Sequence, residues 1–119
     1  MTKPLMILVA GPYRSGTDGD PEKIAANLKA MTDTALALYE AGHLPMLGEW
    51  LALPLIKAAG STEEGDPIFD RIFHPSAERL LSKCDGCLRI GGASSGADRM
   101  VRTAESLGVA VYYALEEIP

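Results

Sequence analysis

Short apolar runs alternate along this chain with longer segments in which apolar residues recur every three or four positions. The first run, residues 5–10, is continuous and ends in Gly-Pro, which is typical of a central parallel strand buried on both faces. Residues 21–41 then carry one apolar stripe with helical spacing. Pro21 suits the first position of this helix and Gly42 suits its end, so we predict a helix of about 20 residues.

The middle of the chain is less regular. Residues 43–47 predict a second short strand, and residues 49–60 predict a short helix or a broken turn, because Pro54 interrupts them. Residues 60–67, GSTEEGDP, are polar and rich in turn formers, which makes them the candidate for a mobile segment. The apolar positions that follow indicate a helix that starts at Pro75.

Three further elements complete the pattern. We expect a strand over residues 86–90, a helix over residues 95–107 that Gly108 ends, and a final strand over residues 109–115. Strands that alternate with helices indicate βαβ units and a parallel sheet covered on both faces. We therefore predict a single domain over residues 1–119 with an α/β fold, a flavodoxin-like or Rossmann-like three-layer arrangement with a four- or five-stranded parallel sheet.

In such a fold the ligand lies beyond the carboxyl ends of the strands. We therefore expect the loops of residues 11–20 and 91–96 to converge on a site. The first loop begins GPYRSGT, which has the glycine spacing of a phosphate-binding P-loop but lacks its lysine. The helix after it also starts several residues late, so we do not expect a nucleoside triphosphatase.

The second loop, GGASSG, is a better candidate for an anion site. Its paired glycines let the backbone approach a ligand closely, and the amides at the start of the next helix favour an anion. Arg14 or Arg99 would complete a phosphate pocket. Alternatively, Ser95 and Asp98 have the spacing of a capping box and serve only to start the helix. The candidate binding residues are Gly11, Arg14, Gly91, Gly92, Ser94, Ser95, Gly96, Arg99 and Met100.

Composition narrows the classes of partner and the location. Of the 119 residues, 47% are hydrophobic and 23% are charged, as in soluble globular domains. The net charge of −5 argues against a nucleic-acid partner, because a duplex requires a basic face. The chain has no apolar run of membrane-spanning length, and its apolar start lacks a signal cleavage site, so we predict a cytoplasmic protein without a membrane partner.

Cys84 and Cys87 form a single C-x-x-C pair. A structural zinc site needs four ligands, and no second pair stands at a suitable spacing. A redox-active C-x-x-C motif stands at the N-terminus of a helix. Cys84 instead lies at the C-terminus of a predicted helix, and Cys87 lies in the next predicted strand. We therefore predict buried, inert thiols, and we expect neither a metal nor a cofactor.

The order of several short motifs resembles the nucleoside 2-deoxyribosyltransferase superfamily, in particular its short, uncharacterised members. These motifs are AGPY after the first strand, A-G-H-x-P, C-D, and S-x-G-A followed by alanine and glycine, and together they cover nearly the whole chain. The resemblance implies a flavodoxin-like sheet, a homodimer or larger homo-oligomer, and cleavage or transfer at the N-glycosidic bond of nucleosides or nucleotides.

Four residues take roles from this resemblance. Tyr13 corresponds to a tyrosine near the sugar, and Gly96 corresponds to the glycine that opens the active-site helix. His43 corresponds to a residue that orients the second strand, for which a core or strand-end role is the expectation. Asp85 corresponds to the C-D position, for which we expect a capping or turn role.

Two positions depart from the family pattern. The family nucleophile, a glutamate four residues after the glycine of the last loop, is replaced by Met100. A helper aspartate eight residues before Asp85 is replaced by Ala77, with Glu78 beside it. Methionine cannot attack an anomeric carbon, and Met100 also fits the apolar stripe of its helix. The family mechanism therefore does not transfer intact.

A second resemblance points to the same ligands. The motif G-G-x-S-x-G-A-D-R is similar to a Rossmann-like group that contains phosphoribohydrolases of cytokinin-type nucleotides and proteins that bind such ligands without cleaving them.

The sequence leaves two hypotheses about function open. The first is a glycosidic-bond enzyme in which Tyr13 acts with Glu49 or Asp98, or less plausibly Glu78, as the substitute carboxylate. The second is a module that binds or senses a nucleotide or nucleotide sugar. Apolar residues Trp50, Leu53 and Leu55 are the candidates for a self-association surface.

Overall fold

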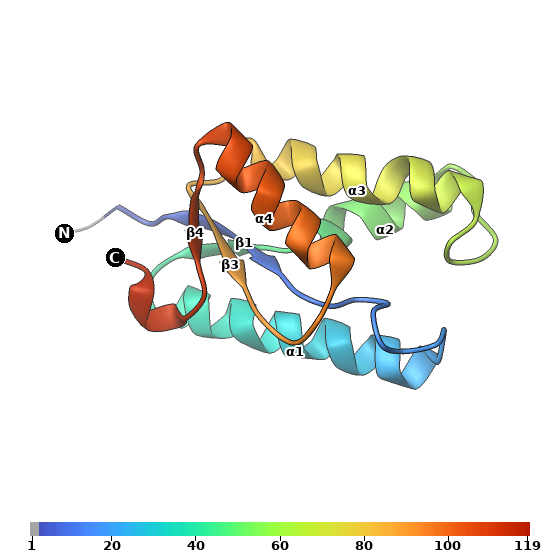
Figure 1. The fold of residues 1–119 in the computed structure, drawn as a ribbon, viewed down its shortest axis with the longest axis horizontal. Coiled ribbons are helices and arrows are strands. Elements are labelled where there is room, and N and C mark those ends of the chain that lie inside the picture. The colour runs from blue at the N-terminus through green and yellow to red at the C-terminus, as the bar shows by residue number, and fades with distance from the viewer. Residues whose placement is uncertain (1–2) are drawn as a thin grey trace.

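The computed structural model describes residues 3–119 and contains a four-stranded parallel sheet (Figure 1). The strands are β1 (Met6–Ala10), β2 (Leu44–Met46), β3 (Gly86–Arg89) and β4 (Ala110–Tyr112). Their order is β2-β1-β3-β4, which is the order of the first four strands of a flavodoxin-like sheet. The α/β fold and the number of strands expected from the sequence are confirmed.

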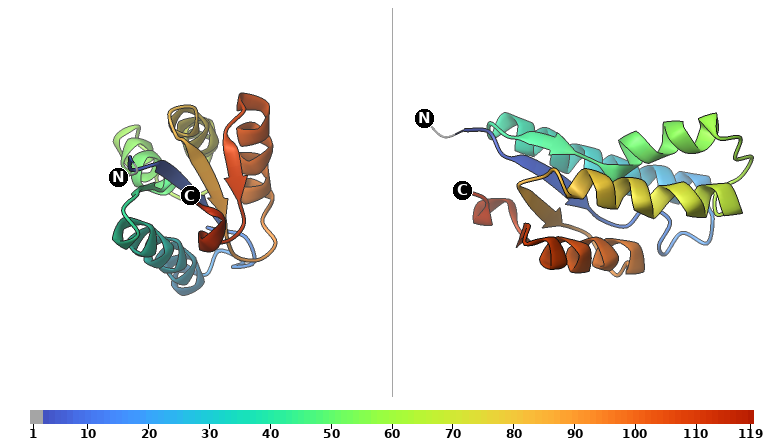
Figure 2. Two further views of the ribbon diagram at one scale, coloured as in Figure 1. Left: turned by 90° about the vertical axis from the view of Figure 1, so that its left-hand side faces the viewer. Right: turned by 90° about the horizontal axis from the view of Figure 1, so that it is seen from above.

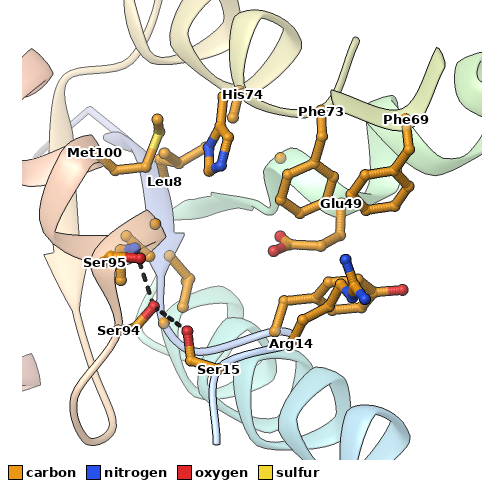
Figure 3. Close-up of a pocket in the computed structure, with 18 of the residues that line it drawn as sticks. Leu8, Arg14, Ser15, Glu49, Phe69, Phe73, His74, Ser94, Ser95 and Met100 are labelled. Atoms are coloured by element: carbon orange, nitrogen blue, oxygen red, sulfur yellow. Dashed lines mark hydrogen bonds between the residues drawn. The ribbon is translucent and has the colours of Figure 1, made fainter. Parts of the chain in front are cut away.

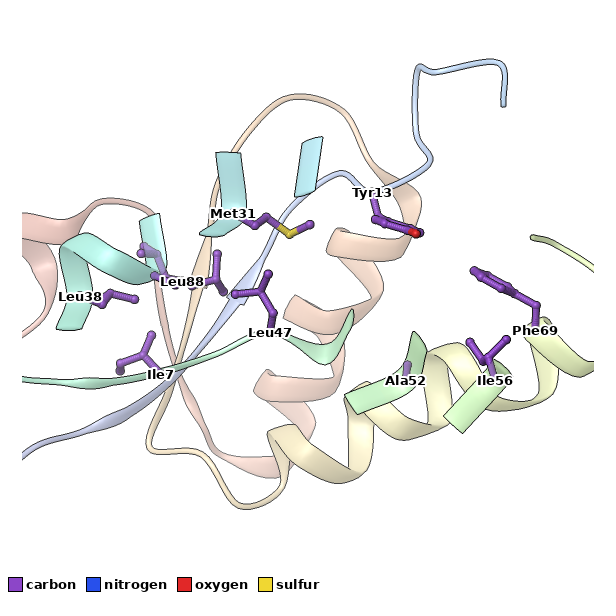
Figure 4. Close-up of a cluster of buried hydrophobic side chains, with 11 residues drawn as sticks. Ile7, Tyr13, Met31, Leu38, Leu47, Ala52, Ile56, Phe69 and Leu88 are labelled. Carbon is purple, nitrogen blue, oxygen red and sulfur yellow. The ribbon is translucent and has the colours of Figure 1, made fainter. Parts of the chain in front are cut away.

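Helices cover both faces of this sheet. In the described residues they are α1 (Pro21–Glu40), α2 (Gly48–Ala58), α3 (Pro67–Leu81) and α4 (Ser95–Leu107), followed by the 3₁₀ helix η1 (Leu115–Glu117). Successive residues of β1 point to opposite faces, as in any strand. Ile7 and Val9 pack in a core with α1 (Figure 4), whereas Leu8 and Ala10 pack in a second core with α4 and the end of α3.

The helices α2 and α3 pack against each other and extend past the carboxyl ends of the strands (Figure 2). They therefore form a wall on one side of the sheet edge where the loops after β1 and β3 lie. This arrangement creates a space between the helix pair, the β1–α1 loop and the first turn of α4. None of the described helices is both long enough and apolar enough to cross a bilayer.

The start of α3 differs from the prediction, whereas α2 is the short helix that was one of the two alternatives for residues 49–60. α3 begins at Pro67 rather than Pro75, because Asp66 caps it by accepting a hydrogen bond from the Phe69 amide at 2.8 Å. Pro75 therefore lies inside the helix. α2 also continues through Pro54 without a break. Both helices keep an internal proline because their extensive mutual packing outweighs the lost backbone hydrogen bond.

The other two helices agree with the prediction. The Asp20 carboxylate caps α1 and Pro21 occupies its first turn. α4 ends at Gly108, whose φ of 74° is in the left-handed region that glycine adopts without strain.

Candidate functional site

A pocket of about 210 Å³ opens at the carboxyl ends of the strands (Figure 3). Its walls come from the loop after β1, the start of α2, the pocket-facing side of α3 and the first turns of α4. The polar side chains that line it are Tyr13, Arg14, Ser15, Glu49, Asp70, His74, Ser94 and Ser95. The pocket therefore brings together residues from four separate parts of the chain.

The loops after β1 and β3 converge at this pocket, as the sequence predicted. The Ser15 hydroxyl donates a hydrogen bond to Ser94 Oγ at 3.1 Å (Figure 3). Gly91 has a φ of 78°, and a Cβ there would lie 2.6 Å from Pro12 Cδ. Glycine at this position thus allows the two loops to touch.

Ser94 also starts α4. Its Oγ accepts a hydrogen bond from the Ala97 amide at 3.1 Å, and its backbone is extended, so Ser94 is the N-cap residue. The alternative of a capping box between Ser95 and Asp98 is therefore wrong. Ser95 remains available to the pocket, beside the unpaired amides of the first helical turn.

Glu49 is the buried carboxylate of the pocket. It lies in the first turn of α2 and is 9% exposed, and Figure 3 shows its side chain between Phe73 and Arg14 with the carboxylate directed into the pocket. Burial raises the pKa of Glu49, against a smaller lowering by its own backbone amide. Within residues 3–119 it forms no ion pair.

Tyr13 and Arg14 line the pocket and both contact Glu64. The Tyr13 hydroxyl donates to Glu64 Oε1 at 2.7 Å, and Arg14 Nε lies 3.6 Å from Glu64 Oε2. Burial raises the pKa of Tyr13, and the hydrogen bond to Glu64 raises it further. Tyr13 is therefore a neutral hydrogen-bonding group. Arg14 also lies over the ring of Phe69, with its Cζ 5.7 Å from the ring centroid.

Three aromatic rings form one apolar wall. Phe69 and Phe73 stack with ring centroids 4.8 Å apart, and Phe73 and Tyr13 stack at 5.5 Å. All three residues line the pocket. These rings give the pocket an apolar wall.

Met100 and Ala77 both lie in the pocket wall. They are the two positions at which the sequence departs from the pattern of the family that it resembles. Met100 is 6% exposed, packs in the core beneath α4 and also lines the pocket. Ala77 lines it from α3. Met100 thus satisfies both expectations, core and cleft. Neither of these two positions carries a carboxylate.

Several residues proposed from the sequence lie outside the pocket. Asp98 pairs with Arg89, with Oδ1 3.1 Å from Nη2, and Arg99 pairs with Glu78 at 2.8 Å. Gly91 and Gly92, together with Asp98, line a separate groove. The candidates Gly11, Tyr13, Arg14, Glu49, Ser94, Ser95, Gly96 and Met100 line the pocket itself. Of the three proposed substitute carboxylates, only Glu49 does so.

The remaining residues singled out in the sequence lie away from the pocket and stabilise the fold. His43 Nδ1 accepts a hydrogen bond from the Leu5 amide at 3.2 Å, and Asp85 Oδ2 accepts one from the Met6 amide at 2.8 Å. Both hold the start of β1, at the end of the sheet opposite the pocket. Cys84 and Cys87 are free and buried, as predicted. Burial raises their pKa values to about 11 and about 12.

Sequence reasoning missed the contribution of α3, namely Phe69, Asp70, Phe73 and His74. These residues were assigned to no element because the helix was expected to start at Pro75. The available signal was Asp66-Pro67, a cap followed by proline at the first helical position. Phe69 and Phe73, like Asp70 and His74, are four residues apart and therefore share a helix face.

Within residues 3–119, no group of three or more histidine, cysteine, aspartate or glutamate side chains is arranged to hold a metal ion.

No model of a known protein family matches the sequence, and no curated protein matches it significantly.

Proposed function

We propose that this pocket binds a nucleoside or nucleotide and that the protein cleaves or transfers its N-glycosidic bond, with Glu49 as the catalytic carboxylate. The observation that carries the proposal is the Glu49 carboxylate, which is directed into the pocket and has no cationic partner in the described chain. A buried carboxylate in that position is costly to keep unless the site uses its charge.

The surrounding groups suit the parts of such a ligand. The stacked rings of Phe69 and Phe73 match the face of a base, and the first turn of α4 with Ser95 matches a phosphate. Cleavage of the glycosidic bond leaves positive charge on the sugar ring in the transition state. The Glu49 carboxylate stabilises that charge or attacks the anomeric carbon, and Tyr13 beside it orients the sugar.

The direct test is incubation with a panel of nucleosides and nucleoside monophosphates, with chromatography to detect free base. We expect Glu49→Gln to reduce base release by about 10²-fold or more, because the amide cannot supply the charge. Glu40→Gln, on the exposed end of α1, is the matched control and should keep full activity. Equal rates for Glu49→Gln and the unaltered protein would contradict the role of Glu49.

A second candidate function is binding or sensing without chemistry. The apolar side chains of Met100 and Ala77 favour it, because they stand in the pocket wall where the resembling enzymes have carboxylates. A thermal-shift screen distinguishes the two functions when it is read together with base release. Stabilisation by a nucleotide without release of base would support the binding function. Larger shifts with monophosphates than with the matching nucleosides would support the phosphate position at α4.

We also propose that the protein is a cytoplasmic homo-oligomer. Trp50 and Leu55 on α2 are 43% and 46% exposed, and Leu51 beside them is 39% exposed. Leu53, in contrast, packs partly against the core, so the candidate surface is Trp50, Leu51 and Leu55. Two unpaired cysteines suit the reducing cytoplasm. Light scattering at tens of micromolar protein tests the assembly, and a monomer would contradict it.

A further inference from the structure

His74 is a titratable side chain in the pocket to which neither the sequence motifs nor the proposed function assigns a role. It lies on α3, is half-buried and lines the same pocket as Glu49. Figure 3 shows its imidazole between Met100 and Phe73, directed into the pocket. Burial and nearby charges shift its pKa, and no side chain or backbone group of residues 3–119 forms a hydrogen bond with its ring. A half-buried imidazole of this kind is free to bond to a ligand or a water molecule.

The ring is held in place by its neighbours. It packs edge-on against Phe73 with ring centroids 5.3 Å apart. On its other side lies Gly96 in the first turn of α4, where an added Cβ would be 3.1 Å from His74 Cε1. Glycine at this position therefore leaves room for the imidazole beside the helix start. The orientation of His74 depends on both α3 and α4.

Burial favours the neutral form of His74. Burial lowers its pKa most, the positive charge of Arg99 on α4 lowers it further, and Glu78 and Asp70 on α3 act in the opposite direction. Glu49 on α2 faces the same pocket. Neutral imidazole carries a lone pair that accepts a proton, which is the requirement for a general base at neutral pH.

We propose that His74 is the general base that activates the water molecule in glycosidic-bond hydrolysis; this inference rests on the function proposed above. The water oxygen forms a bond to the anomeric carbon as the bond from that carbon to the base nitrogen breaks. The electron pair of the broken bond stays on the nitrogen. The water proton passes to His74 and returns through solvent to the departing base. The products are the free sugar, or sugar phosphate, and the free base.

The test compares His74→Ala and His74→Asn with the unaltered protein and with Arg71→Ala. Arg71 is exposed on the same helix and does not line the pocket, so its variant is the matched control. Asparagine keeps a planar polar group but cannot take up a proton, and it provides a second variant if alanine impairs folding. Circular dichroism checks the fold, and thermal shift with a nucleoside monophosphate checks binding.

We expect both His74 variants to lose about 10²-fold or more in kcat while their thermal shift with ligand persists. Azide is a nucleophile that has no proton to lose, so it should restore base release in His74→Ala and yield the glycosyl azide, which mass spectrometry detects. Arg71→Ala should match the unaltered protein.

Four results would overturn the assignment, and they differ in meaning. A kcat within about 3-fold of the unaltered protein, or a loss that azide does not restore, would remove His74 as the base but leave the proposed function intact. A rise in KM alone would make His74 a binding residue. If the unaltered protein released no base from any ligand that stabilises it, the proposed function would fail and the role of His74 with it.

Discussion

The Tyr13 hydroxyl and the Glu64 carboxylate are joined by a hydrogen bond of 2.7 Å, although the two residues are 51 positions apart in the chain. The turn that precedes α3 is thereby tied to the loop after β1, next to the pocket that Tyr13 lines. Arg14 packs closely against the same turn. A Cβ added to Gly65 would lie only 2.6 Å from Arg14 Nη1. The segment predicted to be mobile therefore touches two pocket residues. Whether it moves remains a prediction.

Glu64→Gln should weaken this tie and free Arg14 for an anion. We expect faster hydrogen exchange in residues 61–65 and a several-fold gain in affinity for a nucleoside monophosphate, measured by calorimetry. The free energy of unfolding should change by less than about 1 kcal/mol, because the pair is substantially exposed. Glu63→Gln, one residue away, is the control. An unchanged affinity would mean that Glu64 does not compete with ligands for Arg14.

Glu49→Gln should stabilise the protein at neutral pH. Burial raises the pKa of Glu49, so the folded state favours the protonated carboxyl; the associated stability is present at acid pH and is lost as the pH rises through the folded pKa. Glutamine carries no charge at any pH and avoids this loss. We expect a gain of about 1 kcal/mol or more at pH 7 to 8 that vanishes toward acid pH, measured by urea unfolding. A gain independent of pH would contradict this origin.

Met100→Glu should fold at a cost below about 2 kcal/mol, because its carboxyl can reach water in the pocket that Met100 lines. Met100→Leu should cost less than about 1.5 kcal/mol, since it keeps an apolar side chain of similar volume. Denaturant unfolding measures the free-energy cost of both substitutions. Base release by the glutamate variant above that of the unaltered protein would support the glycosidic-bond proposal. Failure of the glutamate variant to fold would show that the site is core and not cleft.

Cys84 and Cys87 should react slowly with a thiol reagent in the native protein. Both are buried, with pKa values raised to about 11 and about 12, so little thiolate exists at neutral pH. A chromogenic disulfide reagent should label two thiols only after unfolding in guanidinium. Rapid labelling of the folded protein would contradict the burial of these residues.

The parallel sheet and the helices α1 and α4 were predictable because their signals are local. The apolar run of β1, the stripe of α1 and the glycine after α4 each lie within one element and report directly on burial and termination. Asp66 and Pro67 also mark the start of α3 locally, although Pro75 offers a competing start. Proline inside a helix is disfavoured in isolation, and only packing against α2 makes it acceptable.

The set of residues that line the pocket was harder to predict from the sequence. The sequence alone determined that the loops after β1 and β3 would meet at the carboxyl ends of parallel strands, because that follows from strand direction. Only the tertiary structure decided that Glu49 lies inside the pocket while Asp98 pairs with Arg89 outside it. The direction of a side chain on a helix depends on how that helix is rotated against its neighbours. That rotation is set by contacts between segments far apart in the chain, as between His74 on α3 and Gly96 on α4.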